Sequence, residues 1–216
     1  FFNKKANNTI LLFHFNNDFK YIGKNVGPVT WGGGINVSGK FDQAAKFDSA
    51  PIIFDQSQWF WDIISEGNYT IELWYYCTNK SSKQGFITSD ISGSPTGFAF
   101  YIGYDNIIYG NFDNYESVSS SVLEIGWNHI ALSSNNKSCG LYINGINKFN
   151  KKKTISKQDY DICIGGRTGS SDNMTGGIID EIRISNIPRY TTNFTPPSQP
   201  FIICLLYTSD AADEAR

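Results

Sequence analysis

The sequence predicts an all-β fold of antiparallel strands, arranged as a sandwich or a barrel. From residue 69 onward, apolar runs of strand length recur about every 8 to 12 residues, with turn residues between them. Hydrophobic residues make up 40% of the chain and aromatic residues 15%, while the abundant Asn, Gly, Ser and Thr favour turns over helices. A chain of 216 residues fits one domain of this kind.

The first expected strand is the apolar run 9–15, which is followed by a cluster of turn residues at 16–18. Short strand-like runs come next, at 44–48 and 51–54. The longest expected strand covers residues 69–77, and its alternation places Ile71, Leu73, Tyr75 and Cys77 on one face and Glu72, Trp74 and Tyr76 on the other.

Further strands are expected at the runs QGFIT, GFAFYIGY, NIIYGNF, WNHIALS, GLYI, INKF, YDICIGG and GIIDEIRIS. Between GLYI and INKF, the pair Asn144-Gly145 predicts a two-residue hairpin turn, because both central positions of that turn need a positive φ. Apart from a single turn at 188–192, no helical period is found.

Composition argues against two classes of partner. No apolar run approaches the roughly 20 residues that a transmembrane helix needs, so we expect no membrane insertion. The lysines at 148 and 151–153 form a basic run, but the chain has 18 basic and 20 acidic residues. A solvated loop therefore explains the run better than nucleic-acid binding does.

Six segments, taken in order, resemble laminin-G-like (LamG) jelly-roll domains of the concanavalin A-like lectin/glucanase superfamily: LLFHFNND, YTIELWYY, WNHIALS, LYINGI, ICIGGR and GGIIDEIRISNIPRYTTNFTPP. The resemblance covers nearly the whole chain. It implies a jelly-roll β-sandwich of two antiparallel sheets that binds glycans or cell-surface polymers, often with a structural calcium ion. The last segment is similar to versions found in phage tail and virion proteins and in bacterial surface proteins.

The run 178–184 contains a carboxylate that needs a partner. Strand alternation places Asp180 on the apolar face with the isoleucines of the run, where a bare charge is costly. Two interpretations stay open: Asp180 accepts backbone N–H bonds, or it joins Asp18 as a ligand of the calcium ion that the resemblance implies. On the opposite face, Arg183 is placed to meet Glu72 across strands as a structural ion pair.

Catalysis is not expected. Glucanases of the superfamily use a Glu-x-Asp-x-x-Glu strand, whose paired carboxylates lie about 5 to 5.5 Å apart. None of the six Glu residues of this chain has Asp two positions on and Glu five positions on. His14 and His129 lie in apolar strand runs, which indicates core groups, and no Gly-x-Ser-x-Gly elbow occurs.

Sugar binding needs aromatic faces for the ring and amide or carboxylate groups for the hydroxyls. Trp59 and Trp61 are candidates, because they share a face if the sequence WFW is extended. The second group of candidates contains Tyr104, Asp105, Asn106 and Tyr109, together with Asn114 and Tyr115. Core or hairpin packing is the alternative for each aromatic residue.

The C-terminal residues 204–216 resemble the translation of a sequencing adapter, the transposase end used in tagmentation libraries. We therefore expect residues 1–8 to be a remnant of a longer protein, 9–203 to be the jelly-roll domain, and 204–216 to be an artefact. Cys77, Cys139 and Cys163, which remain without the tail, lie in strand-like runs and are expected to be buried thiols.

These observations favour a non-catalytic carbohydrate- or surface-binding module of a larger phage virion or bacterial surface protein. The expected partners are a glycan or cell-surface polymer and the other domains of the parent protein. The expected location is the virion or the cell surface. The alternatives are a structural spacer or oligomerisation domain and, third, a glycoside hydrolase.

Overall fold

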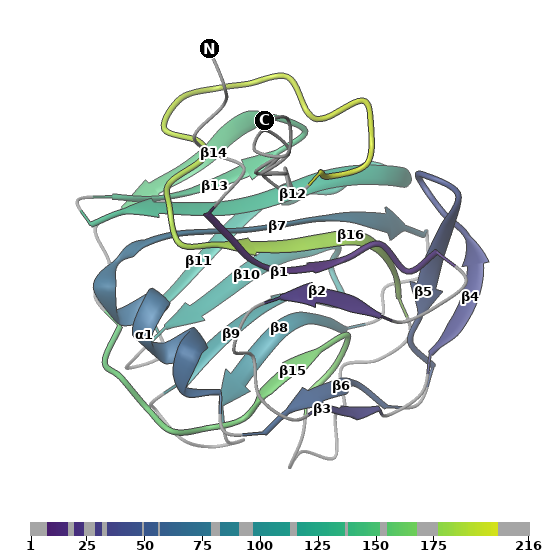
Figure 1. The fold of residues 1–216 in the computed structure, drawn as a ribbon. Helices are drawn as coiled ribbons and strands as arrows, with labels where there is room; N and C mark the ends of the chain where they lie inside the picture. The colour runs from purple at the N-terminus through teal and green to yellow at the C-terminus, as the bar shows by residue number, and fades with distance from the viewer. Residues whose placement is uncertain are drawn as a thin grey trace, which may run out of the picture.

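The fold was analysed in a computed structural model, drawn in Figure 1. The structure describes residues 8–16, 20–23, 29–31, 34–48, 50–55, 57–78, 83–90, 97–112, 116–136, 138–151, 155–167 and 177–202. All statements below concern these residues.

Two antiparallel sheets face each other (Figure 1), as the sequence predicts. Sheet A has nine strands; seven follow the order β14-β13-β12-β7-β16-β1-β2, and the β4–β5 hairpin joins through β5 to β16. Sheet B has seven strands in the order β11-β10-β9-β8-β15-β6-β3. The first and last strands of the chain, β1 and β16, are neighbours in sheet A.

The strands are β1 Thr9–Phe13, β2 Tyr21–Gly23, β3 Val29–Trp31, β4 Ile35–Ser38, β5 Gln43–Lys46, β6 Ile52–Phe54, β7 Asn68–Cys77, β8 Gln84–Asp90, β9 Gly97–Ile102, β10 Ile107–Phe112, β11 Glu116–Val122, β12 Gly126–Asn135, β13 Cys139–Ile143, β14 Ile146–Lys151, β15 Ile162–Ile164 and β16 Ile178–Ser185. The helix α1 covers Gln58–Glu66.

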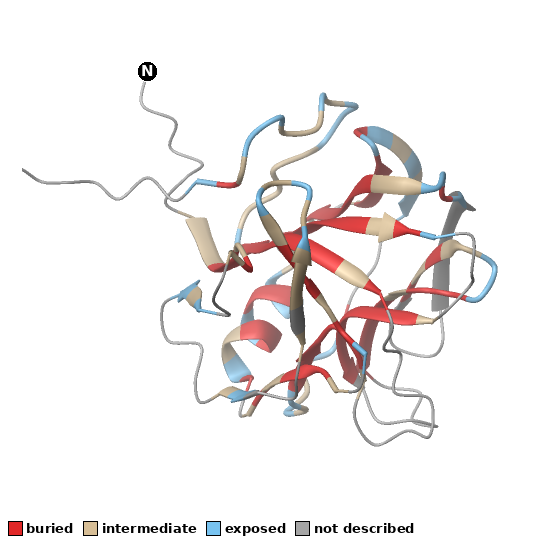
Figure 2. Cartoon of the chain, turned by 90° about the vertical axis from the view of Figure 1, so that its right-hand side faces the viewer, coloured by how far each residue is buried: buried red, intermediate tan, exposed pale blue. Residues whose placement is uncertain are grey.

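The core lies between the sheets, where Figure 2 shows the buried segments. In β7, Ile71, Leu73 and Tyr75 point into this core, so the predicted alternation of the longest strand is confirmed. Glu72 and Trp74 lie on the outer face of sheet A. The cysteines of the described residues, Cys77, Cys139 and Cys163, are buried free thiols, which also agrees with the sequence.

The predicted Asn-Gly hairpin is confirmed. Asn144 and Gly145 have φ angles of 50° and 79° and connect β13 to β14. The side chain of Asn144 fixes the turn further, because its Oδ1 accepts a hydrogen bond of 2.9 Å from the backbone N–H of His129.

Two helix predictions are wrong. Residues 58–66 form α1, which ends at Gly67 in the left-handed region with a φ of 80°. The helix buries Phe60, Ile63 and Ile64 against the core, a spacing that puts these residues on one helical face. Residues 188–192, where one helical turn is expected, have no helical structure.

The C-terminal segment, residues 186–201, crosses the outer face of sheet A and is the yellow trace at the top of Figure 1. Backbone bonds fix it in place: Phe194 donates to the carbonyl of Gly145 at 2.9 Å, and Phe201 donates to Glu181 Oε2 at 2.6 Å. This segment therefore buries polar side chains on a sheet face that would otherwise meet solvent.

Candidate functional site

A surface pocket lies at the hairpin that joins β9 to β10 in sheet B. The hairpin is closed by the N–H of Gly103, which donates to the carbonyl of Ile107 at 2.9 Å, and by Asn106, whose φ is 57°. Across the two strands Tyr101 pairs with Tyr109, and their rings stack with centroids 5.5 Å apart. Both tyrosines lie on the outer face, because their neighbours Ile102 and Ile108 point into the core.

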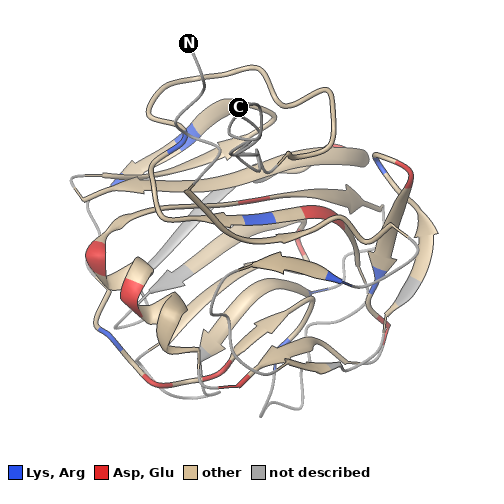
Figure 3. Ribbon diagram, viewed as in Figure 1, with Lys and Arg blue, Asp and Glu red and all other residues tan. Residues whose placement is uncertain are grey.

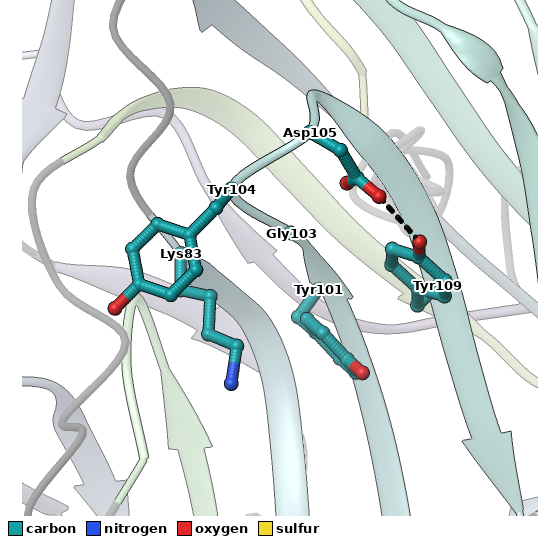
Figure 4. Close-up of a pocket in the computed structure, with 6 residues that line it drawn as sticks. All are labelled: Lys83, Tyr101, Gly103, Tyr104, Asp105 and Tyr109. Carbon is teal, nitrogen blue, oxygen red and sulfur yellow. Dashed lines mark hydrogen bonds between the residues drawn. The ribbon is translucent and has the colours of Figure 1, made fainter.

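The pocket has a volume of about 280 Å³, and Figure 4 shows its lining. Its lining residues are Lys83, Tyr101, Gly103, Tyr104, Asp105 and Tyr109. Tyr104 is 59% exposed, so its ring is available to a ligand. The ammonium group of Lys83 lies 5.7 Å from the centre of the Tyr104 ring, within the range of a cation–π contact.

Asp105 is held by its own hairpin. Its Oδ2 accepts a 2.6 Å bond from the hydroxyl of Tyr109, and its Oδ1 accepts a 3.1 Å bond from the N–H of Ile107. The bond from Tyr109 is the main cause that lowers the pKa of Asp105, and the same bond raises the pKa of Tyr109. Asp105 is therefore an ionised acceptor in a fixed orientation, next to two stacked rings.

The structure brings together three of the residues proposed from the sequence, Tyr104, Asp105 and Tyr109. Asn106 belongs to the same turn, but its side chain donates to the carbonyl of Thr78 at 3.4 Å and does not line the pocket. The lining residues that sequence analysis missed are Lys83, Tyr101 and Gly103. The pairing of neighbouring strands could have indicated them, because β8 and β10 lie on the two sides of β9. Asn114 and Tyr115 lie outside the described residues.

The proposal of an extended WFW segment is wrong, because these residues belong to α1. Residues two apart in a helix lie about 200° apart, so Trp59 and Trp61 do not share a face. Trp61 is fully buried, and its Nε1 donates to the carbonyl of Tyr160 at 3.0 Å. Trp59 is half-buried and packs against the core near Phe54. The alternative of core packing explains both.

A buried charge cluster lies under the C-terminal segment. Glu72 and Arg183 are register partners, and Glu72 Oε1 accepts bonds from Arg183 Nε at 2.9 Å and Nη2 at 2.7 Å, as the sequence predicts. The hydroxyl of Tyr190 donates to Glu72 Oε2 at 2.7 Å, and His129 Nε2 lies 3.3 Å from that oxygen. Burial raises the pKa of Glu72, but the charge of Arg183 and these bonds outweigh burial and lower it to about 2.

Asp180 does not lie on the apolar face, so this prediction is wrong. A β-bulge between Asp180 and Arg183, with Glu181 at a φ of 53°, shifts the alternation by one residue. Asp180 therefore lies on the outer face opposite Trp74 and is still fully buried. Its Oδ2 accepts a 3.0 Å bond from the N–H of Phe41, as the hydrogen-bonding interpretation requires, while burial raises its pKa to about 7.

The described residues do not supply a complete calcium site at Asp180. Oδ1 is the one oxygen of this carboxylate that has no hydrogen-bond partner among the described residues. Among the same residues, no group of three or more His, Cys, Asp or Glu could hold a metal ion. Calcium takes six to eight oxygen ligands. Asp18 lies outside the described residues, so calcium binding stays a prediction on which no later argument depends.

The pocket combines tyrosine rings with one ammonium group and one carboxylate. The pocket is lined by one carboxylate, Asp105, whereas glycoside hydrolysis uses two that face each other.

Figure 3 shows acidic and basic positions interspersed over the described elements, with both signs adjacent on β16. The described part of the chain contains no helix that is long and apolar enough to span a membrane.

Solved structures with the same fold include domain 4 of AbnA, an extracellular arabinanase from Geobacillus stearothermophilus in complex with arabinotriose. It is 21% identical over 82% of this chain and 93% of that domain, with a TM-score of 0.56. A second structure is that of botulinum neurotoxin type C, a toxin whose cell entry depends on interaction with two ganglioside molecules. It is 14% identical over 85% of this chain and 49% of the neurotoxin chain, with a TM-score of 0.63.

A Trypanosoma rangeli sialidase in complex with sialic acid is 8% identical, with a TM-score of 0.62, over 85% of this chain and 31% of the sialidase. At these identities the likeness shows the fold.

No curated protein sequence matches the chain. A family model does match, the laminin-G type of the concanavalin A-like lectin/glucanases superfamily, over residues 55–192, which is more than half of the chain. The chain therefore belongs to the concanavalin A-like lectin/glucanases superfamily.

Proposed function

We propose that the chain is a non-catalytic glycan-binding module and that the β9–β10 pocket is its binding site. The observation that carries the proposal is the arrangement of three tyrosines around a fixed carboxylate and a lysine. Tyrosine rings pack against the apolar faces of sugars, and Asp105 and Lys83 offer an acceptor and a donor for hydroxyl groups. The arabinotriose complex of the similarly folded AbnA domain supports this use of the fold.

The context that we propose is a larger phage virion or bacterial surface protein, in which the module faces a cell-surface polymer. The support is the C-terminal sequence DEIRIS followed by RYTTNFTPP, which resembles modules of such proteins. We expect the module to bind an oligosaccharide without hydrolysing it, which is measured as no release of reducing ends.

The test is a glycan-array screen of residues 1–203, run with calcium and with chelator, followed by titration of the selected glycan. Tyr104→Ala is expected to weaken binding by about tenfold or more, because Tyr104 has the most exposed of the three rings that line the pocket. Tyr109→Phe keeps the stacked ring but removes the bond to Asp105, so we expect a smaller loss.

The matched control is Ile146→Ala, which removes another exposed apolar side chain on the β13–β14 hairpin of sheet A. It should leave the affinity unchanged, and the melting temperatures of all variants should stay close to that of the parent. Equal affinity of the parent and Tyr104→Ala would contradict the assignment of the pocket. Absence of binding to any glycan by the folded parent would favour the structural spacer.

A further inference from the structure

The outer face of sheet A carries a second surface with aromatic side chains. Trp127 of β12 and Tyr76 of β7 are register partners, their ring centroids are 5.3 Å apart, and both residues are half-buried. On the other side of β7, Ile178 of β16 lies opposite Tyr76. This row of three side chains crosses three neighbouring strands that Figure 1 shows in the middle of sheet A.

The next row of the same face contains two buried polar atoms that lack partners. Trp74 and Asp180 lie directly opposite each other, and Trp74 is 6% exposed while Asp180 is fully buried. Trp74 Nε1 and Asp180 Oδ1 have no hydrogen-bond partner among the described residues. Native proteins pair nearly all buried polar atoms with protein groups or with bound molecules, water included, so we expect a bound molecule at this donor and this acceptor.

Two residues of the β4–β5 hairpin lie over the ring of Trp74. Phe41 packs edge-on against Trp74, with centroids 5.8 Å apart, and Lys40 places its ammonium group 4.5 Å from the centre of the same ring. Lys40 is exposed at the tip of the β4–β5 hairpin. A ligand that displaces this ammonium group would contact the indole from that side, while Leu12 and Phe201 pack against other parts of Trp74.

The two unpaired atoms favour a ligand group that both accepts and donates a hydrogen bond. A hydroxyl group accepts a bond from Trp74 Nε1 and donates one to Asp180 Oδ1, whereas a cation would satisfy the carboxylate alone and leave the indole N–H unpaired. The neighbouring rings of Phe41, Tyr76 and Trp127 suit the apolar face of a sugar. We propose that this surface is a second saccharide-binding site, in which a ligand hydroxyl pairs Trp74 with Asp180.

This second site goes beyond the proposed function, because it lies on the outer face of sheet A and the pocket lies on that of sheet B. Two sites on one module would let it hold two sugar units or two chains of a polymer. The gain in affinity for a polymer over a short oligosaccharide would follow from effective concentration alone.

Tryptophan emission separates the two sites, because the pocket is lined by tyrosines and the second site contains Trp74 and Trp127. The probes are arabinotriose, 3′-sialyllactose and cellotriose, titrated into the Tyr104→Ala variant, in which the pocket is disabled. We expect a saturable change in emission with at least one of them. Trp74→Phe, which keeps a ring and removes the donor, should weaken this binding by about tenfold.

Trp59→Phe is the control, since Trp59 belongs to α1 and should change neither the affinity nor the saturable signal. Unaltered emission of the Tyr104→Ala variant with all three probes would overturn the second site. So would equal affinity of Trp74→Phe and its parent, or a crystal structure at saturating probe with only a water molecule between Trp74 and Asp180. Binding that survives Tyr104→Ala but not Trp74→Phe would support the second site, while the pocket is tested separately by the comparison of the parent with Tyr104→Ala.

Discussion

Glu72→Gln is expected to lower the free energy of unfolding by about 3–5 kcal/mol. The carboxylate is fully buried and bonded to Arg183 and Tyr190, so its neutral replacement leaves a buried guanidinium without its counterion. The measurement is urea-induced unfolding at pH 7, followed by fluorescence and circular dichroism.

The control for this change is Asp62→Asn, which removes the exposed ion pair between Asp62 and Lys157. Exposed pairs contribute about 0 to 1 kcal/mol, so this variant should unfold at nearly the same urea concentration as the parent. A cost of Glu72→Gln no larger than that of Asp62→Asn would show that the C-terminal segment does not seal the cluster.

The same cluster predicts an acid dependence. The folded-state pKa of Glu72 is about 2, below its ordinary value of 4.5, so ionised Glu72 stabilises the fold above about pH 4.5. This stabilisation is lost as the pH falls from 4.5 towards 2. The difference in stability between the parent and Glu72→Gln should therefore shrink over this interval, and a constant difference would contradict the assignment.

The sequence predicts the sheets well because their signal is local. The β7 run alternates cleanly, and the Asn144-Gly145 turn needs two positive φ angles that few other residues adopt. The ion pair between Glu72 and Arg183 follows from the alternation in two strands that lie next to each other. The alternation and the turn each depend on a single element, and the ion pair needs in addition that β7 and β16 are neighbours.

The wrong predictions concern segments in which side chains do not alternate between two faces as they do in a regular strand. In β16 the bulge at Glu181 moves Asp180 to the outer face, and the apolar pattern of the run is compatible with either arrangement. In α1 the apolar side chains at 60, 63 and 64 have helical spacing, and Gly67 supplies a C-terminal cap, but the short run resembles a strand. Alternation of side chains alone does not resolve such cases.

Only part of the pocket could be predicted, because only some of its residues are close together in the sequence. Tyr104, Asp105 and Tyr109 belong to one hairpin, so they are close in sequence and in space. Lys83 precedes β8 and reaches the pocket only because β8 pairs with β9. Likewise, the burial of Glu72 depends on the C-terminal segment, which has no regular structure and therefore no periodic signal in the sequence.

Trp61→Ala is expected to lower the free energy of unfolding by about 3–5 kcal/mol, because it leaves a large cavity under α1 and removes the bond to the carbonyl of Tyr160. Trp59→Ala, at a half-buried position of the same helix, should cost clearly less. The two variants are compared by urea unfolding. Because Trp61 is fully buried, Trp61→Phe should bind the selected glycan as the parent does, and a loss of binding without a loss of stability would return this residue to the binding site.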